Sequence, residues 1–305
     1  MVKRFTDECM ELNRHCYEFV LRPATRSGLL DASVDATYII HLLNNGRYDA
    51  ILDQVEAIRP TSALWMVLNK GFKACPKQLP KQVAGYDLAD ATLQIYKHAE
   101  AMGYENILIL EDDCFFHEDL KKPEVQQDLN TVFQQMKDTT FSYRLGCIPF
   151  LMVPFVSHSS VGLYGGAHAY VTSASFRAAA LNATNRLTDI DEYLNIAGSQ
   201  YAYYKPLAYQ LFPDTDNKAT WGTNFSLFPY IFPLLAFFFK LFIRLIGLDV
   251  RAEPGFSFAY LVAKSLFASI ILFVLLAIIG IIGLFFIYKK LNLRVFRPSA
   301  ASTAK

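Results

Sequence analysis

The chain has almost no imbalance of charge. Its 305 residues include 29 Lys and Arg against 28 Asp and Glu, which gives a net charge of +1. General binding to nucleic acid depends on a strong positive field. We therefore expect no nucleic-acid partner.

Cysteine is scarce and scattered. The five cysteines form no CxxC pair, so their spacing indicates neither a zinc site nor a disulfide framework. Reduced thiols in a cytosolic compartment are the simplest interpretation. The five are Cys9, Cys16, Cys75, Cys114 and Cys147.

The N-terminus lacks the apolar run of a secretory signal. Residues 1–14 are polar and charged. We therefore expect the domain that follows to lie in the cytosol.

A long charge-free run is present near the C-terminus. Residues 265–287 are mostly Leu, Ile, Phe, Ala and Gly. A helix of this length crosses a hydrocarbon core of roughly 30 Å. Tyr288, Lys289 and Lys290 follow as an interfacial aromatic residue and a basic stop. The run predicts a transmembrane helix and a C-terminal membrane anchor.

An earlier apolar segment, residues 225–248, allows two interpretations. It contains Lys240 and Arg244 on one helical face, and each would cost about 2.5–3.5 kcal/mol at mid-span. It is therefore either an interfacial helix or the first helix of a membrane hairpin. The basic tail, residues 291–305, favours the hairpin because that topology keeps the tail cytosolic.

The region before residue 225 alternates between strand and helix patterns, which predicts an α/β domain with a largely parallel sheet. Its predicted strands are residues 36–43, 63–68 and 107–110, and its predicted helices are residues 48–58, 88–102 and 123–137. The predicted domains are an N-terminal helical extension (1–33), the α/β domain (34–224), a membrane-associated region (225–290) and the tail (291–305).

Three consecutive carboxylates end the predicted strand at residues 107–110. Glu111 and Asp113 point to one side in extended backbone, and Asp112 points to the other. Open α/β sheets bind ligands at the carboxyl ends of their strands. A divalent cation bridging to a phosphate would relieve the repulsion between these charges. The alternative is a solvated acidic loop.

Several separated motifs occur in a particular order. They are the first strand with Asn-Asn-Gly-Arg (44–47), Ile-Leu-Ile-Leu-Glu-Asp-Asp (107–113), Gly-Gly-Ala-His-Ala-Tyr-Val (165–171), Asp-Ile-Asp-Glu-Tyr-Leu (189–194) and Lys-Pro-Leu-Ala-Tyr-Gln (205–210). Together they resemble glycosyltransferase family 25, which includes bacterial lipopolysaccharide glycosyltransferases and collagen galactosyltransferases. The resemblance covers residues 36–210.

The resemblance implies a GT-A fold, which is Rossmann-like, a nucleotide-sugar donor and a divalent metal, Mn²⁺ or Mg²⁺. Asp113 and Glu111 are then the candidate metal contacts, because a cation at the strand end would stabilise a diphosphate leaving group. Asp112 would face the ribose of the donor or the protein.

The same resemblance suggests further contacts to the donor and the metal. Arg47 could pair with phosphate, or it could be a solvated loop arginine. Gly165 and Gly166 would allow close approach of a ligand, or would form a tight turn. Gln210 matches a glutamine that has either a donor-binding or a structural role. His168 is a candidate metal or phosphate contact, with a packed, hydrogen-bonded side chain as the alternative.

Inverting sugar transfer needs a general base for the acceptor hydroxyl. The resemblance favours Asp191, with Glu192 and Asp189 behind it. The alternative is helix capping by Asp189, with the acids of the first turn stabilising the helix dipole.

Taken together, the sequence predicts a membrane-anchored, metal-dependent glycosyltransferase of the hexosyltransferase type. Its donor would be a nucleotide sugar, and its acceptor a glycan, glycolipid or glycoprotein. The alternative is a non-catalytic, membrane-tethered binding or scaffold protein with the same fold. A metal phosphohydrolase would need a denser His and Asp cluster than the sequence contains.

Overall fold

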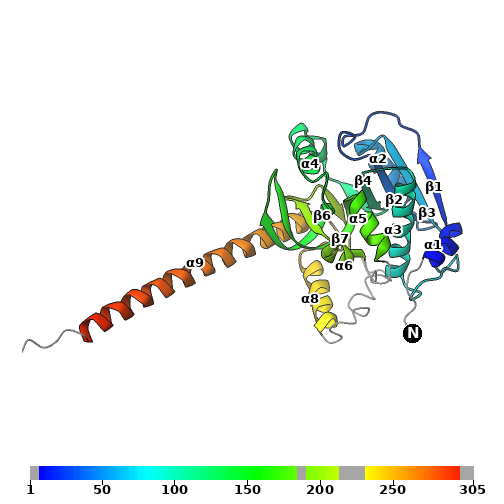
Figure 1. Ribbon diagram of the computed structural model, residues 1–305. Helices are drawn as coiled ribbons and strands as arrows, with labels where there is room; N and C mark the ends of the chain where they lie inside the picture. Colours follow the sequence, from blue (N-terminus) through cyan, green and yellow to red (C-terminus); the bar gives the residue numbers. More distant parts are fainter. Residues whose placement is uncertain (1–6, 184–189, 213–230, 296–305) are drawn as a thin grey trace, which may run out of the picture. The chain divides into compact units, whose positions relative to one another are not determined.

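A computed structural model of the chain describes residues 7–183, 190–212 and 231–295 (Figure 1). The chain divides into two units, Met1–Ala263 and Lys264–Lys305. The described part of the first unit contains all the strands described below. The second unit continues the last helix.

The centre of the first unit is a seven-stranded sheet of order β1-β3-β2-β4-β7-β6-β8. A two-stranded sheet pairs β5 with β9. The strands are β1 (Tyr17–Arg22), β2 (Ala36–Leu42), β3 (Ala63–Asn69), β4 (Asn106–Glu111), β5 (Cys114–Phe116), β6 (Phe141–Pro154), β7 (Ser159–Ser173), β8 (Ser199–Tyr203) and β9 (Ala208–Gln210).

Most strands of the large sheet run in one direction. β2 is parallel to both β3 and β4, and β6 is parallel to β8. β4 and β6 share their direction because both are antiparallel to β7. Only β1 and β7 run the other way among the seven strands. The predicted α/β fold with a mostly parallel sheet is confirmed.

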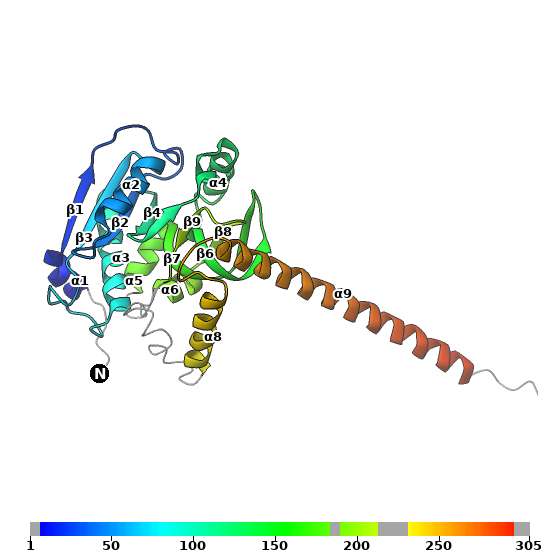
Figure 2. The same ribbon diagram turned by 180° about the vertical axis from the view of Figure 1, so that it is seen from behind.

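Helices cover both faces of this sheet (Figures 1 and 2). Side chains of α3, α5 and α6 enter one hydrophobic cluster, whereas those of α2 and α4 enter a second cluster on the opposite face. The described helices that lie wholly in the first unit are α1 (Asp7–Asn13), α2 (Tyr48–Ile58), α3 (Ala84–Ala101), α4 (Pro123–Gln135), α5 (Ala174–Asn182), α6 (Ile190–Ile196) and α8 (Ile231–Leu245), with 3-10 turns η1 (Arg14–Cys16) and η2 (Glu118–Lys121).

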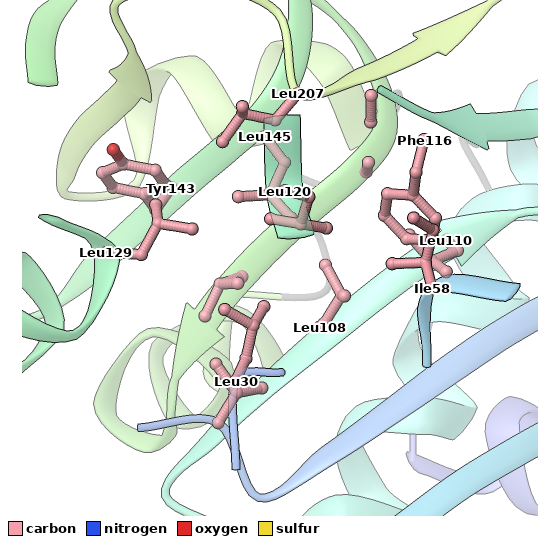
Figure 3. Close-up of a cluster of buried hydrophobic side chains, with 14 of the residues drawn as sticks. Leu30, Ile58, Leu108, Leu110, Phe116, Leu120, Leu129, Tyr143, Leu145 and Leu207 are labelled. Carbon is pink, nitrogen blue, oxygen red and sulfur yellow. The ribbon is translucent and has the colours of Figure 1, made fainter. Parts of the chain in front are cut away.

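Strand β4 contributes to both clusters because its side chains alternate. Ile107 and Ile109 pack in the first cluster, and Leu108 and Leu110 pack in the second, part of which Figure 3 shows. Burial on both faces explains why this strand is a continuous apolar run. The same alternation directs Glu111 toward the face that carries α3, α5 and α6.

The N-terminal region differs from the predicted helical extension over residues 1–33. Described helical structure ends there at Cys16, and β1 then pairs antiparallel with β3. β1 is Tyr-Glu-Phe-Val-Leu-Arg, a sequence rich in strand-forming residues. Pairing with β3, which is distant in sequence, decided this conformation.

The last helix, α9 (Gly255–Val295), begins in the first unit and continues through the second. Among the described residues, Gly255–Phe286 is the one helical stretch long and apolar enough to cross a membrane. It contains most of the predicted span and is compatible with a C-terminal membrane anchor.

Candidate functional site

The three carboxylates lie where the sequence places them, at the carboxyl end of β4. Glu111 is the last residue of β4, and Asp112 and Asp113 form the turn into β5. The neighbouring parallel strand β2 ends beside them at Leu42, and β3, the next strand along the sheet, ends level with it at Asn69. We call this region the acidic edge: Glu111, Asp112 and Asp113.

Asp112 is bound by the end of β2 and by the segment that follows it. Its Oδ2 accepts hydrogen bonds from the Leu42 amide at 3.0 Å and from Asn45 Nδ2 at 2.6 Å, and lies 2.9 Å from His41 Nδ1. Only 8% of Asp112 is exposed. Of the two predicted orientations, Asp112 therefore faces the protein, and it holds the 41–47 segment against the acidic edge.

Arg47 and Gln210 both contact the acidic edge. Arg47 Nη1 lies 3.2 Å from Asp112 Oδ1 and 2.9 Å from Asp113 Oδ2. Gln210 Nε2 donates to Asp113 Oδ1 at 2.8 Å and to Glu111 Oε2 at 3.2 Å. Glu111 and Asp113 thus share one partner, as their predicted common direction requires. The structure brings five predicted site residues together.

These contacts oppose the cost of burying negative charge. Burial raises the pKa of Asp113 above its ordinary value, Arg47 lowers it, and the charge of Asp112 raises it again; the net pKa is raised. For Arg47, burial lowers the pKa, but Asp113 and Asp112 outweigh burial and the net pKa is raised. The acidic edge therefore favours a nearby cation.

The chemistry of the acidic edge fits a hard divalent ion. Mn²⁺ and Mg²⁺ prefer carboxylate oxygens, and a few such oxygens leave positions open for water and phosphate. The guanidinium of Arg47 occupies the position of a cation beside Asp113. Glu111 and Asp113 are the residues that would hold the ion.

Gly165, Gly166 and His168 lie in β7, away from a turn. Gly166 has φ +87°, a conformation that favours glycine, and a Cβ there would meet His168 Nδ1 at 3.2 Å. His168 is fully buried, and its Nε2 lies 3.4 Å from the Ala208 carbonyl oxygen. This burial and this contact favour the packed interpretation of His168.

Buried His168 makes the stability of the protein depend on pH. Burial lowers the pKa of His168 from 6.5 to about 4. Between these values the unfolded chain binds more protons than the folded one, so stability falls as the pH falls. We expect His168→Gln to remove this loss, up to about 3 kcal/mol near pH 4. Urea unfolding of both proteins from pH 8 to pH 4 measures the difference.

The comparison between variants is necessary because Asp90 acts in the opposite sense. Burial raises the pKa of Asp90 from 3.8 to about 6, which stabilises the folded state as the pH falls. Parallel stability curves for wild type and His168→Gln would contradict the assignment of a neutral His168.

Arg144 in β6 is a buried cation without a hydrogen-bond acceptor. None of its three guanidinium nitrogens has a partner in the described residues, and its Cζ lies 5.3 Å from the centre of the Tyr164 ring. An unpaired buried charge is costly. We therefore expect Arg144→Met to raise the free energy of unfolding by about 1–3 kcal/mol in urea titrations.

Arg177 provides a matched control for Arg144. It is similarly buried, but its guanidinium donates to the carbonyl oxygens of Thr172, Glu105 and Tyr104. Arg177→Met should destabilise the protein because it leaves these oxygens unpaired. If both variants lose stability equally, Arg144 has an acceptor under solution conditions.

The predicted base cannot be located by its side chain. Asp189 lies outside the described residues. Asp191 and Glu192 belong to α6 (Ile190–Ile196), but their side chains are outside what the structure describes. Helix α6 lies on the face of the sheet toward which Glu111 points, because its residues Ile190, Tyr193 and Leu194 pack in the hydrophobic cluster on that face.

Sequence reasoning missed His41 and Asn45. His41 lies in the predicted strand at residues 36–43, Asn45 lies in the Asn-Asn-Gly-Arg motif that follows it, and both bind Asp112. Their position in and after a strand parallel to β4 was the available signal. It also missed a buried network beside β3, in which Lys77 Nζ contacts Asn69 Oδ1 at 2.6 Å and Asp87 Oδ1 at 2.5 Å.

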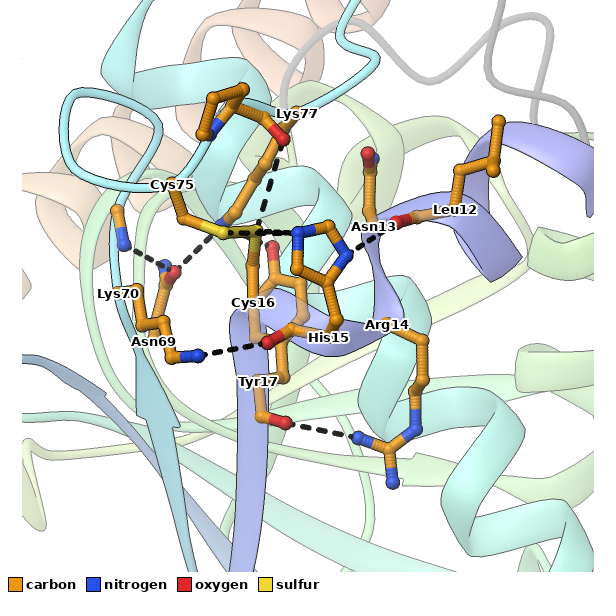
Figure 4. Close-up of a disulfide and its surroundings, with 12 residues drawn as sticks. Leu12, Asn13, Arg14, His15, Cys16, Tyr17, Asn69, Lys70, Cys75 and Lys77 are labelled. Carbon is orange, nitrogen blue, oxygen red and sulfur yellow. Dashed lines mark hydrogen bonds between the residues drawn. A yellow bond between two sulfur atoms is a disulfide. The ribbon is translucent and has the colours of Figure 1, made fainter.

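The prediction of five reduced cysteines was wrong for one pair. Cys16 and Cys75 form a disulfide across a sequence separation of 59 (Figure 4). His15 Nε2 lies 3.6 Å from Cys16 Sγ and 3.4 Å from Cys75 Sγ. Sequence spacing could not identify a bridge this long. Disulfides are rare in the cytosol, so this bridge counts against the predicted cytosolic domain.

His15, Cys16 and Cys75 are the one group of three metal-ligating side chains that converge among the described residues. The disulfide engages both sulfurs of the group. The carboxylates of the acidic edge do not form such a group with His168 in the described part of the chain.

No protein-family model matches the chain, and no curated protein matches it. Among solved structures, A197 from STIV is 11% identical, with a TM-score of 0.36 over 58% of this chain and 85% of that one. A mannose-1-phosphate geranyltransferase from Thermus thermophilus is 13% identical, with a TM-score of 0.34 over 55% and 72%. A UDP-glucose pyrophosphorylase is 12% identical, with a TM-score of 0.32 over 60% and 80%.

Proposed function

We propose that this protein is a membrane-anchored glycosyltransferase that takes a sugar from a nucleotide-sugar donor with the help of Mn²⁺ or Mg²⁺. The observation that supports it most is the acidic edge itself: Glu111 and Asp113 lie at the carboxyl end of a central parallel strand, where Gln210 contacts both and Arg47 contacts Asp113. Ligands of open α/β sheets bind at such strand ends.

The residues at the acidic edge would each have a separate role in binding the donor. Asp113 and Glu111 would hold the ion, which would supply positive charge to the diphosphate leaving group. Arg47, released from Asp113, pairs with the diphosphate. Asp112 keeps the 41–47 segment in place through Asn45 and the Leu42 amide.

The acceptor side is assigned to α6. Asp191, with Glu192 behind it, would take the proton of the acceptor hydroxyl, whose oxygen would bond to the anomeric carbon from the side opposite the diphosphate while the bond to the diphosphate breaks, so that the transfer inverts. This assignment is supported by the position of the α6 backbone, since its neighbours Ile190 and Tyr193 pack on the Glu111 face of the sheet. Gly165, Gly166 and His168 have no part in this proposal.

Thermal unfolding of the full chain in detergent tests the donor and the metal together. We expect nucleotide sugars to raise the unfolding temperature only when Mn²⁺ is present, since a ligand at 100 times its Kd stabilises by about 2.7 kcal/mol. Asp113→Asn should abolish the shift. A response to no nucleotide sugar, with or without metal, would overturn the proposal.

One observation favours a non-catalytic binding protein instead. Asp112 has protein partners on both of its oxygens, and the guanidinium of Arg47 neutralises part of the negative charge of the acidic edge. In that case donor binding would persist in EDTA, and no sugar transfer or donor hydrolysis would occur. Assays of released nucleotide distinguish the two functions.

A further inference from the structure

Helix α8 (Ile231–Leu245) has apolar residues on two sides. Its inner side packs on a third hydrophobic cluster, in which Ile243 is fully buried and Phe242 and Phe239 are partly buried. Its outer side is exposed by 43–60%, although a surface helix normally turns polar residues outward. The outer residues are Leu234, Phe237, Phe238 and Leu241.

The first turns of α9 repeat this arrangement over the same cluster. Phe256 and Tyr260 are buried in it, whereas Phe258 and Leu261 are exposed by 46% and 60%. We define the outer apolar face as Leu234, Phe237, Phe238, Leu241, Phe258 and Leu261. Large apolar side chains exposed on both helices indicate an interaction site.

Chain continuity identifies what covers this face. Leu261 is two residues before Ala263, the last residue of the first unit, and the apolar stretch that can cross a membrane continues from there. The face therefore lies within a few residues of the point where the chain would enter a bilayer. The described length of α8, 15 residues or about 22 Å of helix, is shorter than the roughly 30 Å of hydrocarbon.

The charge of α8 agrees with a lipid surface. Residues 231–248 contain Lys240 and Arg244 and no Asp or Glu. Interfacial helices combine large apolar side chains with basic residues, because the latter attract anionic headgroups. A water-exposed helix or a hairpin span would not need this combination.

We propose that the outer apolar face is embedded in the surface of a lipid bilayer, with α8 lying along the membrane and the first turns of α9 entering it. The face is thus a second membrane contact besides the span. This inference rests on the membrane anchoring in the proposed function.

The segment between α8 and α9 is hydrogen-bonded to β9 and to Phe212, which follows β9. The Phe212 amide donates to the Leu248 carbonyl oxygen at 2.9 Å, and the Tyr209 hydroxyl donates to Glu253 Oε1 at 2.7 Å. Strand β9 contains Tyr209 and Gln210, and Gln210 binds Glu111 and Asp113. Membrane binding would therefore hold the acidic edge close to the lipid surface, which suits an acceptor carried by the membrane.

Tryptophan fluorescence in vesicles tests the proposal with the full chain. Single substitutions Phe237→Trp and Phe258→Trp report on the face, and Ile279→Trp reports on the span. The quenching of wild type, which contains Trp65 and Trp221, is subtracted from that of each variant. Leu21→Trp is the matched control, because Leu21 is exposed by 52% on β1. Vesicles contain phosphatidylcholine and phosphatidylserine, with bromine on either shallow or deep acyl carbons as the quencher.

We expect shallow bromine to quench Phe237→Trp and Phe258→Trp several-fold more than Leu21→Trp, and deep bromine to quench Ile279→Trp most. If Ile279→Trp is quenched but Phe237→Trp and Phe258→Trp behave like Leu21→Trp, the face is covered by protein and the inference is overturned while the anchor stands. If Ile279→Trp is not quenched, the anchor fails, and the inference fails with it.

Discussion

Replacing Asp113 by asparagine is expected to lower metal-dependent sugar transfer or donor hydrolysis by about 10²- to 10³-fold, the size of effect that loss of one preorganised electrostatic group produces. Asp113 accepts hydrogen bonds from both Arg47 and Gln210, so its carboxylate holds these two side chains at the acidic edge. The amide of asparagine keeps the shape of the side chain but removes the charge that would bind the proposed ion. Initial rates measured across a Mn²⁺ titration give the effect.

Two variants make this test specific. Asp53→Asn makes the same chemical change on the exposed side of α2 and should leave the rate unchanged. Asp112→Asn should chiefly destabilise the protein, because Asp112 binds the Leu42 amide and Asn45. Equal activity of wild type and Asp113→Asn at every Mn²⁺ concentration would contradict the assignment of Asp113 to the proposed metal site.

Removing the Cys16–Cys75 disulfide is expected to lower the free energy of unfolding by about 4 kcal/mol, from the chain entropy of the closed loop with its sequence separation of 59. The bridge joins the start of β1 to the segment between β3 and α3. The Cys16→Ser/Cys75→Ser double variant, unfolded in urea without reductant, measures the loss. Wild type in dithiothreitol should match the double variant.

Cys9→Ser is the control, because Cys9 lies outside the bridge and the variant should keep its sensitivity to dithiothreitol. Thiol titration of the unfolded, unreduced protein gives an independent reading. Three free thiols are expected. Five would show that the bridge does not form, in which case the original prediction of reduced cysteines would hold.

The local pattern of β4 was sufficient to predict much of the fold and the centre of the candidate site. Ile107 to Leu110 are apolar because the strand is buried on both faces, and this burial is visible in the sequence itself. The carboxylates follow the strand directly, so their place at its carboxyl end needed no tertiary information. The apolar run in α9 is equally local, because the length and polarity of a span are properties of consecutive residues.

The partners of these groups could not be predicted in the same way. Asp112 binds the segment after β2, which is about 70 residues away in the chain, and the disulfide joins residues separated by 59. Periodicity contains no information about such pairs, since strand order and register determine them. The same reason explains β1: its sequence suits a strand, but only pairing with β3 made it one.

By itself the sequence determined the mostly parallel α/β fold, the acidic strand end and the apolar C-terminal helix, because each follows from the character of neighbouring residues. Only the tertiary structure decided that Asp112 faces the protein, that Arg47 and Gln210 meet Asp113, and that His168 is packed away from the acidic edge. It also decided which side of α8 is buried. These features depend on side chains brought together from distant segments, and contacts of that kind exist only after the sheet has formed.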